Sequence, residues 1–200
     1  LFPYWSAFPA FLRGGAVYDI MFCGAVFDLI FGGDQADTLL GGAGNDTVFG
    51  GNGRDEVFLG EGFDVFNDND QGGDAGNDTV FGGIGFDTIN GGAGADQFFG
   101  GNGNDVISGG NGFDTISGGA GEDVLTGGAG QDTFVFLAAD AGAFGDEVTD
   151  FELGVDVIRI EGATSAAVSY DSVDNEVTIA LGGNDIVDLN STSDLSGFTV

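Results

Sequence analysis

Aspartate recurs at every ninth residue through most of this 200-residue chain, a spacing that can align ligands for metal ions. The aspartates in this register are Asp19, Asp28, Asp37, Asp46, Asp55 and Asp64, followed by Asp78, Asp87, Asp96, Asp105, Asp114, Asp123 and Asp132. A single shift of five residues separates the two runs. Histidine is absent and Cys23 is the only cysteine, which disfavours zinc and iron sites and excludes an internal disulfide. Carboxylates and backbone carbonyls remain, and these are the ligands of calcium.

Each aspartate is the sixth residue of a nine-residue unit, as in GGAGNDTVF (41–49) and GGNGNDVIS (100–108). Thirteen units run from Gly14 to Val135, and the eighth residue is apolar in all of them. Glycine at positions one, two and four tolerates positive φ and lets the backbone approach a ligand. The unit therefore predicts a six-residue turn and a three-residue strand, with position eight facing inward and positions seven and nine facing outward.

One apolar residue per unit is too little to build a core, so the units must stack. Two units per coil would form two parallel sheets, with the turns along both edges and an aspartate about every 4.8 Å, the distance between neighbouring strands. Carboxylates at this distance repel each other unless a divalent ion lies between successive turns. The sequence therefore predicts an all-β fold with cation-linked turns.

The charge of the chain excludes several classes of partner. Thirty-three acidic residues oppose three arginines, giving a formal net charge of −30. No nucleic acid is expected as a partner, because phosphates need lysine or arginine opposite them, and docking on anionic lipid is equally disfavoured. Hydrophobic residues make up 42% of the chain, including 20 phenylalanines, which argues against an acidic disordered tail. No transmembrane span is expected, since the most apolar stretch, 15–31, contains Asp19 and Asp28.

The tandem units resemble the RTX family, the haemolysin-type calcium-binding repeat GGxGxDxUx with U apolar, over residues 14–135. The resemblance implies a right-handed parallel β-roll, with calcium between a turn and the next turn on the same edge. The implied carboxylate ligands are Asp46, Asp55, Asp64, Asp78, Asp87, Asp96, Asp105, Asp114, Asp123 and Asp132. The carbonyl ligands implied for the glycine-rich turns are Gly42, Gly44, Gly51, Gly53, Gly60, Gly62, Gly83, Gly85, Gly92, Gly94, Gly101, Gly103, Gly110, Gly112, Gly119, Gly121, Gly128 and Gly130. Pairing of alternate units would give at most about eight calcium ions.

The first three units depart from this pattern. Val17, Val26 and Gln35 replace the glycine at position four, and Cys23 replaces the glycine at position one. We expect these turns to keep the coil but to bind calcium poorly or not at all. The segment 68–73 resembles the start of an EF-hand loop, but its twelfth position is a threonine and not glutamate. We therefore interpret 68–72 as a loop inserted at a corner of the roll.

The sequences at the two ends differ from the repeat, so we expect the chain to have three parts. These are a degenerate repeat or an upstream linker over 1–13, the roll over 14–136 and a C-terminal β cap over 137–200. Residues 146–160 resemble the end piece D-x-[IV]-x-D-F-x-x-G-x-D-x-I of RTX proteins, familiar from serralysin-type proteases and alginate epimerases. Short strands at 166–170, 176–181 and 185–189 would form an antiparallel meander. The terminal stretch resembles an uncleaved type I secretion signal, so a type I transporter is the expected export partner and the protein is expected to be extracellular.

The chain holds no catalytic motif of its own. HExxH is impossible without histidine, and neither GxSxG nor a Cys–His pair is present. We interpret the chain as a non-catalytic calcium-binding module that folds after type I export. Two alternatives remain: the C-terminal part of a secreted serralysin-like metalloprotease, lipase or epimerase, or the spacer of an RTX adhesin.

Position nine carries a stripe that the repeat does not require. Alternate units fall on opposite sheets, which predicts two separate series. The first series is Phe22, Leu40, Phe58, Phe81, Phe99, Ser117 and Val135. The second is Phe31, Phe49, Asn67, Asn90, Ser108 and Thr126. The first five residues of the first series would form an outward apolar face, to which a further domain or a second chain could dock.

Overall fold

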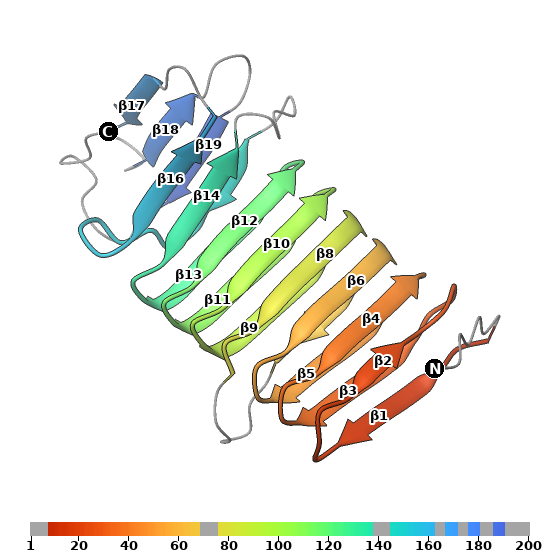
Figure 1. Cartoon of the computed structure of the whole chain (residues 1–200). Helices are drawn as coiled ribbons and strands as arrows, with labels where there is room; N and C mark the ends of the chain where they lie inside the picture. Colours follow the sequence, from red (N-terminus) through yellow and green to blue (C-terminus); the bar gives the residue numbers. More distant parts are fainter. Residues whose placement is uncertain are drawn as a thin grey trace.

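Successive units run along two facing sheets, so that two units complete one coil of a parallel β-solenoid (Figure 1). This computed structural model describes residues 8–68, 76–137 and 145–162, together with the backbone of three strands between 167 and 190. The two sheets lie face to face and the coils stack from the N-terminal to the C-terminal end (Figure 1). The architecture is the all-β roll that the nine-residue period predicts.

Odd-numbered strands form one sheet and even-numbered strands the other, apart from the last three strands. Sheet A contains, in spatial order, β1 (Phe11–Gly15), β3 (Leu29–Asp34), β5 (Thr47–Asn52), β7 (Val65–Asn67), β9 (Thr88–Gly94), β11 (Val106–Gly112), β13 (Val124–Gly130), β15 (Asp146–Val148), β19 (Ile186–Asn190), β18 (Glu176–Ala180) and β17 (Ala167–Asp171). Sheet B contains β2 (Ile20–Phe22), β4 (Thr38–Ala43), β6 (Glu56–Gly62), β8 (Thr79–Gly85), β10 (Gln97–Asn102), β12 (Thr115–Ala120), β14 (Thr133–Leu137) and β16 (Val157–Glu161).

The register of the coils fixes where the inserted residues lie. Thr47 pairs with Val65, which is 18 residues later, so one coil contains two units. Phe58 pairs with Phe81, which is 23 residues later, because five extra residues fall between β7 and β8. The alternation of units between the sheets survives, as expected for an insertion at a corner. Most of the predicted loop, from 69 onward, lies outside the described residues.

The strands are longer than the predicted three residues. Strand β5 includes the glycine pair Gly50 and Gly51, and Gly51 pairs with Gly33 in the previous coil. A Cβ on Gly51 would meet the carbonyl oxygen of Gly33, so glycine permits the close stacking that continues the ladder into the corner. The prediction of a six-residue turn is therefore wrong: the first residues of the unit extend the preceding strand.

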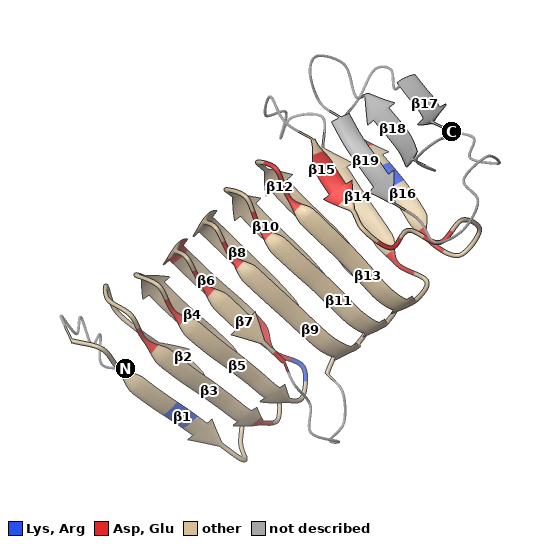
Figure 2. Ribbon diagram, turned by 180° about the vertical axis from the view of Figure 1, so that it is seen from behind, with Lys and Arg blue, Asp and Glu red and all other residues tan. Residues whose placement is uncertain are grey.

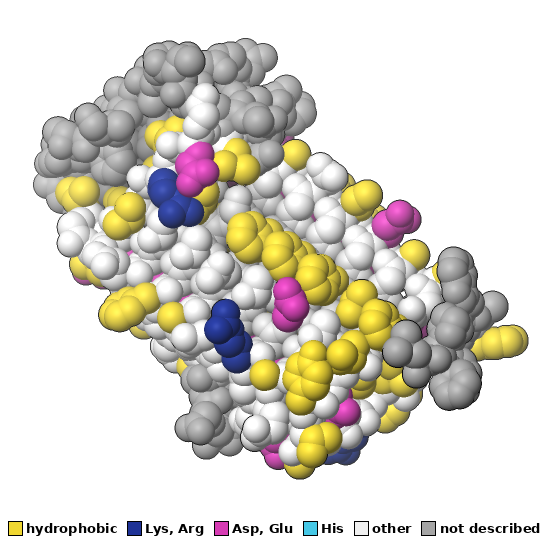
Figure 3. Space-filling view, in the orientation of Figure 1, with side chains coloured by type: hydrophobic (Ala, Val, Ile, Leu, Met, Phe, Trp, Pro, Cys, Tyr) yellow, Lys and Arg dark blue, Asp and Glu magenta, His cyan; other side chains and the backbone are white. Residues whose placement is uncertain are grey.

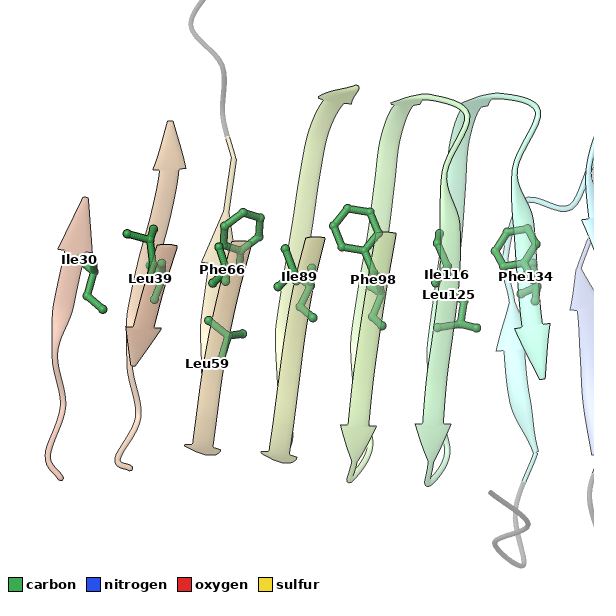
Figure 4. Close-up of a cluster of buried hydrophobic side chains, with 14 of the residues drawn as sticks. Ile30, Leu39, Leu59, Phe66, Ile89, Phe98, Ile116, Leu125 and Phe134 are labelled. Atoms are coloured by element: carbon green, nitrogen blue, oxygen red, sulfur yellow. The ribbon is translucent and has the colours of Figure 1, made fainter. Parts of the chain in front are cut away.

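Position eight forms the core, as predicted (Figure 4). Its side chains from Ile30 onward have no exposed surface, and Met21 in the outermost coil is 9% exposed. Leu59, which replaces a glycine at position one, also points into this core, so position one faces inward. Burial of one such aliphatic side chain contributes about 1.5–3 kcal/mol to the free energy of folding. The side chain is buried only when a neighbouring coil stacks on it, so this contribution depends on the stacking.

Position nine lies on the outer faces of the sheets, and its two series lie on opposite sheets as predicted, but Ser117 and Val135 at the C-terminal end of the first series are buried. The rings of Phe58, Phe81 and Phe99 stack along sheet B with centroids 5.0 Å apart, and Phe58 and Phe99 remain 36% and 37% exposed. A ridge of hydrophobic side chains crosses this face of the molecule (Figure 3). On sheet A the stack of Phe31 on Phe49 is followed by polar residues.

The C-terminal strands extend the roll and then reverse direction. β15 continues sheet A and β16 continues sheet B with parallel pairing. β19 pairs in parallel with β15, and β18 and β17 follow antiparallel, which confirms the predicted meander within one residue at each bound. The described residues form no helix long and apolar enough to cross a membrane.

Candidate metal centre

The position-six aspartates form two ladders, one along each edge of the roll. Acidic residues accordingly recur at the ends of the strands along the roll (Figure 2). The ladder at the corner leading from sheet A to sheet B contains Asp19, Asp37, Asp55, Asp78, Asp96, Asp114 and Asp132. The ladder at the opposite corner contains Asp28, Asp46, Asp64, Asp87, Asp105 and Asp123. All ten aspartates predicted as ligands thus lie in these two rows.

One oxygen of each carboxylate holds neighbouring coils together. Oδ1 accepts the backbone N–H of the aspartate one coil earlier, as in Asp87 N to Asp105 Oδ1 at 2.8 Å. Donor–acceptor distances along both ladders lie between 2.7 and 3.0 Å. The C-terminal end piece continues both ladders, because Asp146 accepts from Asp123 and Asp156 accepts from Asp132.

The second oxygen, Oδ2, is buried inside the turn. It accepts no hydrogen bond in Asp19, Asp37, Asp46, Asp64, Asp78, Asp87, Asp105, Asp114 and Asp132. These side chains are only 1–2% exposed, apart from the half-buried Asp19 in the outermost coil. An unsatisfied buried oxygen costs about 1–3 kcal/mol, and more when it is charged. A whole row of such oxygens indicates that a cation belongs beside them.

The glycines keep the space beside these oxygens open. A Cβ on Gly41, at position one, would lie only 2.6 Å from Oδ2 of Asp46. All eighteen glycines predicted as carbonyl ligands have φ between 94° and 155°, a region that L side chains rarely adopt. The glycines at positions two and four therefore shape turns whose backbone carbonyls stack from coil to coil next to the carboxylates.

The calcium-free ladder strongly disfavours ionised carboxylates. Burial raises the pKa of Asp46 and Asp105 to about 7 and that of Asp78 to about 8. The donated backbone N–H opposes this rise, and carboxylates one coil away add to it. Burial also raises the pKa values of Asp87 and Asp114, to about 6. A divalent ion between turns would reverse the balance by favouring the charged form.

The donor set fits calcium. Each coil offers a buried carboxylate oxygen without a partner and a cluster of backbone carbonyls, and hard oxygen ligands of this kind are those of calcium. The protein cannot neutralise the ladders itself, because it has only three arginines, and Arg159 pairs with Glu161 on the surface at 3.1 Å. The aspartates and turn glycines of units 41–135 would hold the ions and thereby link one coil to the next.

Among the three degenerate N-terminal turns, that of Asp28 differs from the regular turns in its hydrogen bonds. Both oxygens of Asp28 accept protein hydrogen bonds, from Ala10 N at 2.6 Å and from Gly24 N at 3.0 Å, whereas Oδ2 of Asp19 and of Asp37 is unpartnered as in the regular turns. Cys23 lies beside this carboxylate, and burial, followed by the charge of Asp28, raises its thiol pKa to about 12. Gln35 keeps the left-handed turn with φ of 75° although it is not glycine.

One buried acidic residue escaped the prediction. Asp68 is 1% exposed, and one of its carboxylate oxygens lies within 4.8 Å of carboxylate oxygens of Asp55 and Asp78. It was assigned to the inserted loop because it falls outside the nine-residue register. Its place directly after the strand Val65–Asn67 could have identified it, because the residue after each such strand lies at position one, which faces inward.

Comparison with known proteins identifies the repeat. The model of the RTX calcium-binding nonapeptide repeat (4 copies) matches residues 28–66, 72–107 and 99–134, just over half of the chain. No curated protein sequence gives a significant match. Among solved structures the chain is similar to the extracellular lipase LipA from Serratia marcescens, with 20% identity and a TM-score of 0.32 over 90% of this chain and 39% of the lipase. The chain thus spans well under half the length of that lipase. By its matching repeats, this chain belongs to the RTX calcium-binding nonapeptide repeat family.

Proposed function

We propose that this chain is the calcium-binding module of a secreted bacterial protein, that it folds when it binds calcium outside the cell, and that it is not catalytic in itself. The observation that carries the proposal is the pair of carboxylate ladders in which the buried Oδ2 of nine aspartates has no hydrogen-bond partner. Such ladders are stable only with protons or cations beside them.

The physical basis of the switch is mass action. Where calcium is scarce, a chain of net charge −30 with repelling ladders stays unfolded and can pass through a transporter. Extracellular calcium modules bind with dissociation constants of about 10⁻⁴–10⁻³ M. Each site that binds only the folded state adds about 2.7 kcal/mol when calcium is 100-fold above its dissociation constant. Several sites on shared coils therefore make folding cooperative.

Equilibrium dialysis with radioactive calcium tests the binding directly. We expect several ions per chain, at most about eight, with magnesium a poor competitor because it demands tight octahedral geometry and retains its waters. The ten units from Gly41 to Val135 should account for this binding. A chain that binds no calcium at millimolar concentration would contradict the proposed function.

We propose further that a type I transporter exports the chain by its C-terminus. Support comes from the end piece 146–156, which continues both ladders and resembles the family's terminal segment. Deletion of residues 150–200 should abolish secretion in a host that supplies the transporter. A variant that ends at Phe136 and is still exported normally would refute this part of the proposal.

The exposed ridge of Phe58, Phe81 and Phe99 supports a second, structural role as a docking face. The charge of −30 opposes a second copy of the chain, so we propose an apolar surface of another domain as its occupant. Sedimentation of the chain alone in calcium should then show a monomer. A dimer that Phe81→Ser abolishes would assign the ridge to self-association instead.

We propose that any activity of the parent protein resides in sequence outside this chain. A secreted enzyme and an adhesin both remain compatible with a non-catalytic module. An HExxH motif upstream would indicate a metalloprotease, a GxSxG motif a lipase, and repeats of whole domains an adhesin. Sequencing of the neighbouring coding region distinguishes these parents.

A further inference from the structure

Asp68 occupies an inward-facing position that the other described coils of the repeat fill with glycine, cysteine or an apolar residue, and that Asp150 fills in the end piece. The pairing of β5 with β7 and of β7 with β9 places it level with Gly50 in the previous coil and Gly91 in the next. At this position Leu59 and Phe136 point into the core and are buried. Asp150 is only half-buried, whereas Asp68 is a fully buried carboxylate, 1% exposed, at a position of small or apolar groups in the rest of the described repeat.

The carboxylate of Asp68 lies beside two members of the ladder. One oxygen each from Asp55, Asp68 and Asp78 lie within 4.8 Å of one another. Oδ1 of Asp68 accepts the N–H of Gly51 at 2.8 Å, which holds the side chain toward the previous coil. A Cβ built on Gly50 would lie 2.6 Å from Oδ2 of Asp55 and 3.2 Å from Oδ1 of Asp68, so the two carboxylates face the same small space.

Asp78 belongs to the same group of carboxylates and has an unpartnered oxygen. Its Oδ1 accepts the N–H of Asp55 at 2.8 Å, whereas its Oδ2 is buried and accepts no hydrogen bond. In the other turns this Oδ2 lies beside the residue at position one, as for Asp55 and Gly50. In the coil of Asp78 the residue that follows β7, at the level of position one, is Asp68. A carboxylate with an unpartnered buried oxygen thus lies near an additional carboxylate, an arrangement that requires a cation.

We propose that Asp55, Asp68 and Asp78 form one three-carboxylate calcium site at the corner where the chain leaves the nine-residue period, and that calcium binds this site first. The inference rests on the proposed function, because it assumes that the ladders bind calcium. The ordinary sites would use two aspartates from successive turns, whereas this site supplies a third carboxylate. A higher ligand charge strengthens calcium binding at otherwise similar sites.

Asp68→Asn tests the role of the third charge with little change in shape. The amide oxygen still accepts the N–H of Gly51, so the corner keeps its hydrogen bond while the site loses one charge. Glu61→Gln is the matched control, since Glu61 is an exposed acidic residue in the preceding turn. The dissociation constants of the full chain are measured by competition between the protein and a chromophoric calcium chelator, with far-UV circular dichroism at saturating calcium as the folding control.

We expect Asp68→Asn to weaken the tightest site by about tenfold or more, whereas Glu61→Gln leaves it unchanged. Equal affinities in the wild type and both variants would overturn the three-carboxylate site while leaving calcium binding by the ladders intact. A wild type that binds no calcium would instead refute the proposed function itself.

Should Asp68→Asn fail to fold, europium(III) bound to the wild type decides the question. The excitation spectrum of its emission depends on the total charge of the groups that coordinate the ion. For the first equivalent added, it therefore reports how many carboxylates bind that ion. A first equivalent with the signature of three carboxylates supports the proposal, and a two-carboxylate signature overturns it.

Discussion

Asp105→Asn should change stability in opposite directions with and without calcium, and Asp28→Asn is its matched control. Both aspartates belong to the same ladder and both are buried. Oδ1 of each accepts a backbone N–H, from Asp87 in one case and from Ala10 in the other. They differ at Oδ2, which is unpartnered in Asp105 but accepts the N–H of Gly24 in Asp28.

The magnitude follows from the two states of the ladder. In calcium, Asp105 contributes to the sites shared with Asp87 and with Asp123, so its loss removes about 5 kcal/mol at 100-fold calcium excess if both sites fail. Without calcium, the pKa of Asp105 is raised to about 7 by burial, against about 3.9 in an unfolded chain. This gap opposes folding by at most about 4 kcal/mol, of which we expect about half because the sheet edge is screened by solvent.

The assay is a calcium titration at pH 7.5 followed by far-UV circular dichroism, with urea denaturation at both ends of the titration. Asp105→Asn should need more calcium to fold than the wild type, yet resist urea better in chelator. Asp28→Asn leaves one of the N–H groups of Ala10 and Gly24 without its acceptor, so it should lose a similar amount of stability with and without calcium. An equal loss for both variants at every calcium concentration would show that these carboxylates are structural only.

Three further outcomes follow from the same geometry. Gly110→Ala should destabilise the calcium-bound roll by more than Gly154→Ala in thermal unfolding, because both residues have positive φ but only a Cβ on Gly110 would meet a carbonyl, that of Gly92; equal losses would contradict the close stacking of coils. Gln35→Gly should raise the melting temperature, since the left-handed turn costs a non-glycine residue about 1–3 kcal/mol; a lower melting temperature would argue against that turn. In chelator, the ladder aspartates have folded pKa values raised to about 6–8, so their contribution to stability is fully present below about pH 4 and is lost as the pH rises through those values. Acid should therefore induce β structure without calcium, and a circular dichroism spectrum that does not depend on pH would contradict the burial of charge.

The nine-residue period was sufficient to predict the ladder and the core. Successive side chains of a strand point to opposite faces of the sheet. Once the apolar residue at position eight faces the core, position nine must therefore face outward, and alternate units place it on opposite sheets. The five-residue phase shift also predicted a corner insertion, since any other place would have exchanged the outward faces of all later strands. The ridge of Phe58, Phe81 and Phe99 on one sheet confirms that parity is kept.

Three features could not be predicted from the period. The extent of the strands depends on contacts between coils, because Gly51 joins the ladder only when its neighbour Gly33 lies directly beneath it. Asp68 was missed because its role depends on the coil register and not on its place in the repeat. The pairing of Oδ2 of Asp28 with Gly24 is a third detail that needs coordinates, although the valine and cysteine substitutions around it already predicted a weak turn.

Small-angle X-ray scattering of the full chain, in chelator and then in millimolar calcium at neutral pH, tests most directly whether calcium binding and folding are one event. An unfolded chain of 200 residues has a radius of gyration of about 48 Å, and a compact one of about 17 Å, with an elongated roll slightly above that value. Coupled folding predicts a cooperative collapse from near the larger value to near the smaller one, which magnesium does not reproduce. A chain that is already compact in chelator, with the same radius of gyration before and after calcium, would contradict the account.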